Sequence, residues 1–171
     1  MLSRRRHETR TMNVAMADKM TRVTGNPPLR ILVAMATFNE IENLPGLVKE
    51  IRRQLPDADI LVVDDNSPDG TGDWCRHQQQ QDPRFQAIHR AGKLGLGSAI
   101  LEEFTYAVRH QYDRLITMDA DFSHHPRYIP DMLDAIKDVD VAIGSRYVEG
   151  GGDDRVFLRA SSSKYFNLVS R

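Results

Sequence analysis

The sequence has one cysteine, one tryptophan and no long apolar run. Because Cys75 stands alone, the chain can form no internal disulfide and no zinc site built from several thiolates, so we expect a reducing, cytoplasmic setting. The longest apolar run, residues 31–36, has six residues, whereas a transmembrane helix needs about 20. We therefore expect no segment of these 171 residues to cross a membrane.

Charge is nearly balanced, at a formal net charge of −1, but it is unevenly distributed. Residues 1–30 carry seven Lys and Arg against two acidic residues, and the rest of the chain carries 16 against 22. An acidic body argues against nucleic acid as the main partner, because that binding depends on basic surface. The basic segment has no apolar stretch typical of a secretory signal. We therefore expect a disordered leader at residues 1–29 and one domain at residues 30–171.

From residue 31 onward, short apolar runs alternate with segments of helical spacing. Strands are predicted at residues 31–35, 60–63, 85–89, 115–118 and 139–143, and helices at 44–55, 71–81, 95–109 and from Pro126 to Ile136. This alternation predicts an α/β fold with a mostly parallel sheet flanked by helices. The third predicted helix should turn one apolar face inward, made of Ala99, Ile100, Phe104, Ala107 and Val108.

Two acidic segments follow two of the predicted strands. Asp64 and Asp65 end the second strand, and Asp119 and Asp121 follow the fourth. The carboxyl ends of parallel strands meet at one edge, and ligands of open parallel sheets bind outside that edge. We therefore expect both acidic segments on one ligand-binding rim.

The strongest local signal is the Asp-Ala-Asp at residues 119–121. Two neighbouring carboxylates at a strand end suit Mg²⁺ or Mn²⁺, which complete their ligand shell with water and substrate phosphates. A metal held there would neutralise charge on a diphosphate leaving group. The competing interpretation is that these acids only cap a turn and the next helix, and for an isolated Asp-x-Asp that interpretation is favoured.

Other residues near the same rim allow two interpretations each. The 64–70 segment has turn composition, but a carboxylate there can also accept a hydrogen bond from a ribose or a base. The glycine-rich 92–98 segment matches neither the dinucleotide fingerprint nor the P-loop, and either approaches a ligand or the acidic loop closely or is simply flexible. Arg146 suits a phosphate or a salt bridge. We expect His124 and His125 to hydrogen-bond their loop and Cys75 to pack.

Together these segments resemble the polyprenol-phosphate and dolichol-phosphate mannosyltransferases of glycosyltransferase family 2, which have the Rossmann-like GT-A fold. The matching motifs are residues 39–40, 62–71, 92–99, 118–126 and 144–147, and the glycine run at 150–152 followed by Arg159 and Ser163. The resemblance implies a metal-dependent hexosyltransferase that moves mannose from GDP-mannose to a polyprenyl or dolichyl phosphate with inversion.

The resemblance also implies roles for individual residues. By similarity, the nucleotide-sugar would be surrounded by Ala36, Phe38, Glu40, Val63, Asp65, Asp119, Ala120, Asp121 and Arg146. Asp119 and Asp121 would be catalytic by holding Mg²⁺ or Mn²⁺, with Ser123 where some relatives supply a further ligand. The acceptor phosphate would lie against Arg146, Arg159 and Ser163. A lipid-phosphate acceptor implies peripheral contact with the cytoplasmic face of a membrane.

The relatives continue past the point that corresponds to Arg171, so we expect the C-terminal part of the GT-A domain to be missing from this chain. Three alternatives stay open. The chain is a family 2 enzyme with another nucleotide-sugar or acceptor, or a nucleotide-binding fragment without turnover, or a phosphatase with an aspartyl nucleophile. The last generally has its Asp pair near the N-terminus, unlike Asp119.

Overall fold

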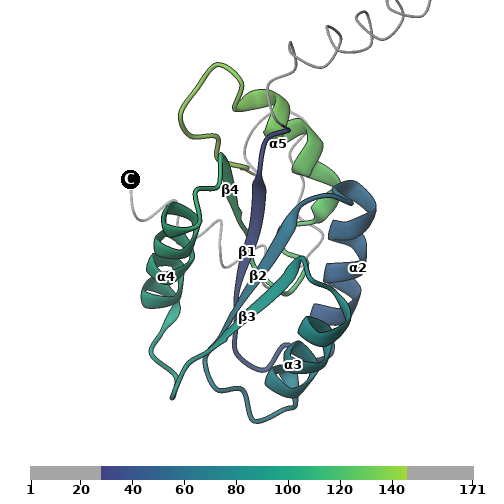
Figure 1. The fold of residues 1–171 in the computed structure, drawn as a ribbon, viewed down its shortest axis with the longest axis vertical. Helices are drawn as coiled ribbons and strands as arrows, with labels where there is room; N and C mark the ends of the chain where they lie inside the picture. Colours follow the sequence, from purple (N-terminus) through teal and green to yellow (C-terminus); the bar gives the residue numbers. More distant parts are fainter. Residues whose placement is uncertain (1–27, 146–171) are drawn as a thin grey trace, which may run out of the picture.

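Four parallel strands form the centre of the structure, a computed structural model that describes residues 28–145 (Figure 1). The strands are β1 (Ile31–Thr37), β2 (Asp59–Asp64), β3 (Phe85–His89) and β4 (Arg114–Thr117), in the spatial order β3-β2-β1-β4. The helices are α2 (Leu44–Gln54), α3 (Thr71–Gln81), α4 (Leu96–Arg109) and α5 (Ile129–Ala135), with a 3₁₀ turn, η1 (Pro126–Tyr128), before α5. The predicted parallel α/β fold is confirmed.

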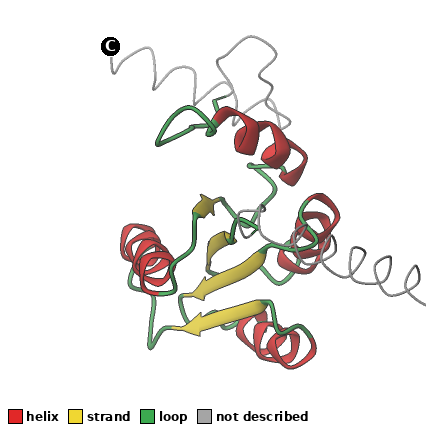
Figure 2. Cartoon of the chain, turned by 45° about the horizontal axis from the view of Figure 1, so that its top comes forward, coloured by secondary structure: helices red, strands yellow, loops and turns green. Residues whose placement is uncertain are grey.

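The sheet is covered on both faces, which explains its continuous apolar strands (Figure 2). Side chains alternate along a strand, so Val33 and Met35 pack in a cluster with residues of α2, whereas Leu32 and Ala34 pack in a second cluster with residues of α4. No helix among the described residues is long and apolar enough to span a bilayer.

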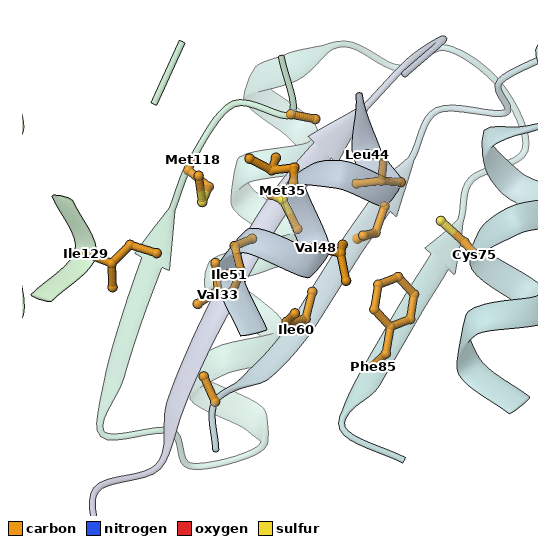
Figure 3. Close-up of a cluster of buried hydrophobic side chains, with 14 residues drawn as sticks. Val33, Met35, Leu44, Val48, Ile51, Ile60, Cys75, Phe85, Met118 and Ile129 are labelled. Atoms are coloured by element: carbon orange, nitrogen blue, oxygen red, sulfur yellow. The ribbon is translucent and has the colours of Figure 1, made fainter. Parts of the chain in front are cut away.

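The larger cluster lies between the sheet and the helices α2, α3 and α5 (Figure 3). Leu44, Leu47 and Ile51 of α2 are fully buried in it, and each such side chain contributes about 1.5–3 kcal/mol by its burial. Cys75 of α3 is also fully buried there, and burial raises the pKa of its thiol to about 12. The prediction that Cys75 packs in the core is confirmed.

The face that α4 turns to the sheet differs from the prediction. Phe104 and Val108 were expected inside but are 53% and 78% exposed, whereas Ala99, Glu103 and Ala107 are buried. These three residues follow one another at intervals of four, which places them on one helical face. Two of them are alanines, so the backbone of α4 can lie close to the sheet. The prediction is confirmed for Ala99 and Ala107 and wrong for Phe104 and Val108, because α4 carries apolar side chains on more than one face.

The fifth predicted strand, residues 139–143, is not a strand in the structure. Val141 and Ile143 are 70% and 84% exposed, and among the described residues β4 is the last strand at its edge of the sheet. A strand needs pairing with a neighbour as well as an alternating sequence, and residues 139–143 do not pair with the open edge of β4. Residues 1–27 and 146–171 lie outside the described residues, so the predicted boundary at residue 30 stays a prediction.

Candidate functional site

The carboxyl ends of β1, β2 and β4 meet at one rim of the sheet. The parallel register places Thr37, the last residue of β1, beside Asp64, the last residue of β2. The Asp65 N–H donates to the Thr37 carbonyl at 3.0 Å, and the Met118 N–H donates to the Ala34 carbonyl at 3.1 Å. The acidic segments that follow β2 and β4 therefore share one rim, as the sequence predicts.

Asp64 has a structural role at this rim. Its side chain is buried, and it accepts hydrogen bonds from the Thr37 hydroxyl at 3.0 Å and from the Ser67 N–H at 3.2 Å. The Ser67 hydroxyl donates to the same carboxylate at 2.5 Å. This is the turn chemistry that the composition of the segment indicates, and it fixes where the next residue, Asp65, points.

Asp65 forms a buried ion pair with Arg90, which follows β3. Both side chains are less than one-tenth exposed, and the guanidinium donates to Asp65 Oδ1 through Nε. The other carboxylate oxygen, Oδ2, accepts the Gly95 N–H at 3.0 Å. Removing one partner of such a pair leaves a buried charge without its counterion, at a cost of about 3–5 kcal/mol. Asp65 therefore joins β2, β3 and the glycine-rich segment.

The glycine-rich segment is held by the same arginine. Arg90 donates to Ser98 Oγ at 2.7 Å and to the Gly95 carbonyl at 3.1 Å. Gly95 has φ +92° and ψ 155°, a conformation that residues with a side chain rarely adopt. Of the interpretations left open by the sequence, close approach to the acidic loop is confirmed.

Phe38 and Glu40 lie where β1 leaves the sheet. The Phe38 ring is half-buried, and the Lys93 ammonium nitrogen is 3.8 Å from its centroid. The Glu40 N–H donates to Thr71 Oγ1 at 3.0 Å, and its carboxylate accepts a hydrogen bond from the Asn43 amide at 2.9 Å. An aromatic face and a carboxylate are thus present at this exit, and a cation covers one face of the ring.

Val63 and Ala36 offer different surfaces. Val63 is fully buried among the residues packed against α4, so only its main chain is available to a ligand. Ala36 is half-buried and lines the rim cavity described below. Both positions are compatible with a ligand that lies over the strand ends, but their side chains carry no polar group.

Asp119 and Asp121 flank a buried alanine. Ala120 is 4% exposed and belongs to the apolar core, whereas the side chain of Asp119 is 51% exposed. The Ser123 N–H donates to Asp121 Oδ1 at 2.9 Å. Burial alone would raise the pKa of Asp121, but the hydrogen bonds from Ser123 outweigh it and hold the pKa below its usual value. Asp121 therefore presents an ionised carboxylate at neutral pH.

Two histidines order the loop after these aspartates. The Asp119 N–H donates to His124 Nδ1 at 3.1 Å, and the Arg127 N–H donates to His125 Nδ1 at 3.2 Å. The prediction that both histidines hydrogen-bond their loop is confirmed. Phe122 has φ 62°, which is uncommon for a bulky residue and marks local backbone strain.

A cavity of about 140 Å³ lies between α4 and the ends of β1 and β4. Its lining residues are Ala36, Leu96, Ile100, Glu103, Thr117, Met118, Asp119 and His124. Glu103 is buried, and burial, followed by the charge of Asp119, raises the pKa of its carboxyl to about 7. A larger hollow, about 340 Å³, lies near Arg114 at the amino end of β4, away from the rim.

Comparisons with known proteins add the family. The model for glycosyl transferase family 2 matches residues 32–169. The chain belongs to glycosyltransferase family 2. This membership argues against the phosphatase alternative, whose aspartyl nucleophile belongs to a different class of protein. The predicted Arg146, Arg159 and Ser163 lie outside the described residues, so the choice between phosphate and salt bridge at Arg146 stays open.

Two family 2 relatives have related names. The undecaprenyl-phosphate mannosyltransferase of Micrococcus luteus is 46% identical over 123 residues, which cover 72% of this chain and 51% of the relative. The polyprenol monophosphomannose synthase of Mycolicibacterium smegmatis is 47% identical over 130 residues, which cover 75% of this chain and 49% of the relative. The chain thus spans about half the length of these curated relatives.

A solved structure supports the fold. The mannosyltransferase PcManGT from Pyrobaculum calidifontis, in complex with GDP-Man and Mn²⁺, matches with a TM-score of 0.54 and 19% identity, over 80% of this chain and 43% of that chain. At this identity the likeness shows the fold alone, and it confirms the predicted GT-A class.

Three charged residues at the rim of this family 2 chain are not among the site residues predicted from the sequence. Arg90 pairs with Asp65, Lys93 covers Phe38, and Glu103 lines the cavity. Arg90 and Lys93 closely follow the carboxyl end of a predicted strand, and this position was a usable signal. Glu103 had no such signal, because the helical pattern predicted an apolar inner face.

Proposed function

We propose that this chain carries the donor-binding part of an enzyme that transfers mannose from GDP-mannose to a polyprenyl or dolichyl phosphate. One observation carries the proposal. The accessible carboxylates that follow β4, Asp119 and Asp121, share a rim with Asp65 and Phe38 in a family 2 chain. Relatives at 46% and 47% identity are named for polyprenyl-phosphate mannosyl transfer, which supports this choice of donor sugar and acceptor.

The nucleotide would lie over the ends of β1 and β2. Phe38 offers an aromatic ring to the base, and Lys93, now 3.8 Å above the ring centroid, would move aside and be free to pair with a phosphate. Asp65 would accept a hydrogen bond from the base or ribose with a lone pair that Arg90 and Gly95 leave available. Glu40 and the main chains of Ala36 and Val63 complete this proposed surface.

Asp119 and Asp121 would hold Mg²⁺ or Mn²⁺, with Ser123 beside them. The donor set fits these metals, because both carboxylates are hard oxygen ligands and Asp121 is ionised. Among residues 28–145 no group of three or more His, Cys, Asp or Glu side chains is arranged to hold a metal ion, so the proposed ion would take its remaining ligands from water and substrate phosphates. When bound, the metal would neutralise charge on the departing diphosphate.

Transfer with inversion requires one displacement. An oxygen of the acceptor phosphate would form a bond to C1 of the mannosyl group as the bond from C1 to the diphosphate oxygen breaks. The acceptor oxygen is already anionic, so no side chain has to remove a proton, and positioning with charge stabilisation supplies the rate. Ala120 anchors the aspartates to the core, while Arg146, Arg159 and Ser163 are proposed to bind the acceptor phosphate.

The acceptor determines where such an enzyme works. A polyprenyl phosphate lies in a membrane, so we include peripheral contact with the cytoplasmic face of a membrane in the proposal. A family 2 enzyme that uses another nucleotide-sugar would need the same rim and metal, and differs only in the contacts to the base and the sugar.

Calorimetric titration of the 171-residue chain with GDP tests the proposal. With Mn²⁺ present, the wild-type chain should bind GDP, and Asp119→Ala combined with Asp121→Ala should weaken binding at least about tenfold, because each carboxylate makes charged contacts worth about 1.5–3 kcal/mol. Chelation of the metal should have the same effect on the wild-type chain.

The matched control is Asp131→Ala combined with Asp134→Ala, which removes the same charge from exposed positions of α5. This control should leave the affinity within twofold of the wild-type value. GDP binding that survives both the rim double variant and chelation would refute the metal assignment. Binding without formation of polyprenyl-phosphate mannose would support the alternative of a nucleotide-binding fragment.

A further inference from the structure

One buried acid on α4 has an oxygen that no hydrogen bond satisfies. Glu103 is 1% exposed, and its Oε2 is the only buried side-chain nitrogen or oxygen without a partner among residues 28–145. Burial of a carboxyl group without compensating hydrogen bonds is costly. A residue that lowers stability in this way is a candidate for a functional role, and its position decides which role.

Glu103 lies at the wall of the rim cavity. It shares this cavity of about 140 Å³ with Asp119, Thr117 and His124, so the unsatisfied acid is next to the residues proposed to bind the donor. A water molecule occupies about 30 Å³ of liquid, and the cavity therefore has room for several waters or for the polar groups of a ligand. The raised pKa of Glu103 has burial and the charge of Asp119 as its causes.

The chemistry of the lining restricts the ligand. Thr117, His124 and the two acids supply hydrogen-bonding groups, whereas Leu96, Ile100 and Met118 supply apolar surface. The lining includes no lysine or arginine, so a phosphate would find no counterion inside. A neutral group with several hydroxyls and apolar C–H surface fits better, because hydroxyls donate to carboxylates and C–H groups pack on aliphatic side chains.

We propose that Glu103 accepts a hydrogen bond from a hydroxyl of the donor's sugar and that the rim cavity is the subsite for this sugar. The inference rests on the proposed function, because it places the sugar beside the aspartates that would bind the diphosphate. Glu103 is then a binding residue for the sugar and makes no contact with the nucleotide. A ligand hydroxyl gives the unsatisfied oxygen the partner that it lacks.

Comparison of GDP with GDP-mannose isolates the sugar's contribution. Calorimetry with Mn²⁺ should show that Glu103→Leu weakens GDP-mannose binding about tenfold or more, as expected when a hydrogen bond to a charged group is lost, and changes GDP binding by less than twofold. Glu103→Gln keeps a carbonyl oxygen as acceptor and should lose less. Glu102→Gln, at the half-buried neighbouring position, is the matched control and should bind both ligands normally.

Each other outcome has a separate meaning. If Glu103→Leu weakens the binding of GDP and of GDP-mannose equally, or changes neither affinity, the proposed contact between Glu103 and the sugar is wrong although the donor-binding proposal survives. If the wild-type chain binds neither ligand, the proposed function fails and this inference fails with it. Thermal unfolding of each variant shows that it is folded, and Glu103→Leu should be at least as stable as the wild-type chain because it removes the unsatisfied carboxyl.

Discussion

Replacement of Glu103 by glutamine removes a titrating group from the core and should change how stability depends on pH. The carboxyl is buried beside Asp119, and its pKa is raised from the ordinary 4.5 to about 7. In the unfolded chain Glu103 ionises near its ordinary pKa, while in the folded protein it keeps its proton until about pH 7. Between these values the folded state binds more protons, so stability falls as the pH rises.

The size of the effect follows from the two pKa values. One pKa unit corresponds to about 1.4 kcal/mol, so the rise from 4.5 to about 7 lowers the free energy of unfolding by about 3 kcal/mol above pH 7 relative to pH below 4. Glutamine does not titrate and shows no such loss. Between pH 5 and pH 7.5, the stability difference between Glu103→Gln and wild type should therefore grow by about 2 kcal/mol in favour of the variant.

Urea unfolding, followed by the fluorescence of Trp74, measures this difference. Trp74 is the only tryptophan and lies edge-on to Phe85, with 5.7 Å between ring centroids, so its emission should report loss of the core. A chelator added to the urea titration prevents metal ions from binding to Asp119. Glu102→Gln is the control and should follow the wild-type pH dependence. Parallel curves for Glu103→Gln and wild type would show that Glu103 does not titrate in this range and would refute the reasoning.

Two further predictions concern buried groups. Asp65→Asn should lower the free energy of unfolding, measured by urea titration, by about 3–5 kcal/mol because Arg90 loses its counterion. The control Asp73→Asn, in an exposed ion pair with Arg76, should change this free energy by about 1 kcal/mol or less. Equal effects of the two substitutions would contradict the buried ion pair. Burial raises the pKa of the Cys75 thiol to about 12, and only the thiolate reacts with thiol-specific reagents. At pH 8 Cys75 should therefore resist such a reagent until urea unfolds the chain. Rapid labelling of the native protein would contradict its buried position.

The sheet and the position of the rim could be predicted because their signals are local. Residues 31–35 and 60–63 are continuous apolar runs, and both became strands buried on two faces. Parallel strands place their carboxyl ends together, so the joint position of Asp65 and Asp119 followed from strand order alone. The resemblance to the mannosyltransferases of family 2 predicted site residues at the same rim.

The errors arise where structure depends on distant partners. Residues 139–143 alternate like a strand, but pairing is a contact between segments and leaves no local trace. The ion pair of Asp65 with Arg90 joins residues 25 positions apart, and no motif marks it. On α4, Leu101, Phe104 and Val108 are exposed while Ala99, Glu103 and Ala107 are buried, so the face that packs against the sheet is not the one with the largest apolar side chains.

The central claim is that the loop after β4 binds a metal together with a nucleoside diphosphate. Backbone amide NMR of the ¹⁵N-labelled chain tests it most directly, since Mn²⁺ broadens the signals of nuclei near it. With GDP present, substoichiometric Mn²⁺ should selectively broaden the amides of residues 119–123, and Asp119→Ala with Asp121→Ala should abolish this broadening. Broadening centred on another part of the chain, or unchanged in the double variant, would contradict the account.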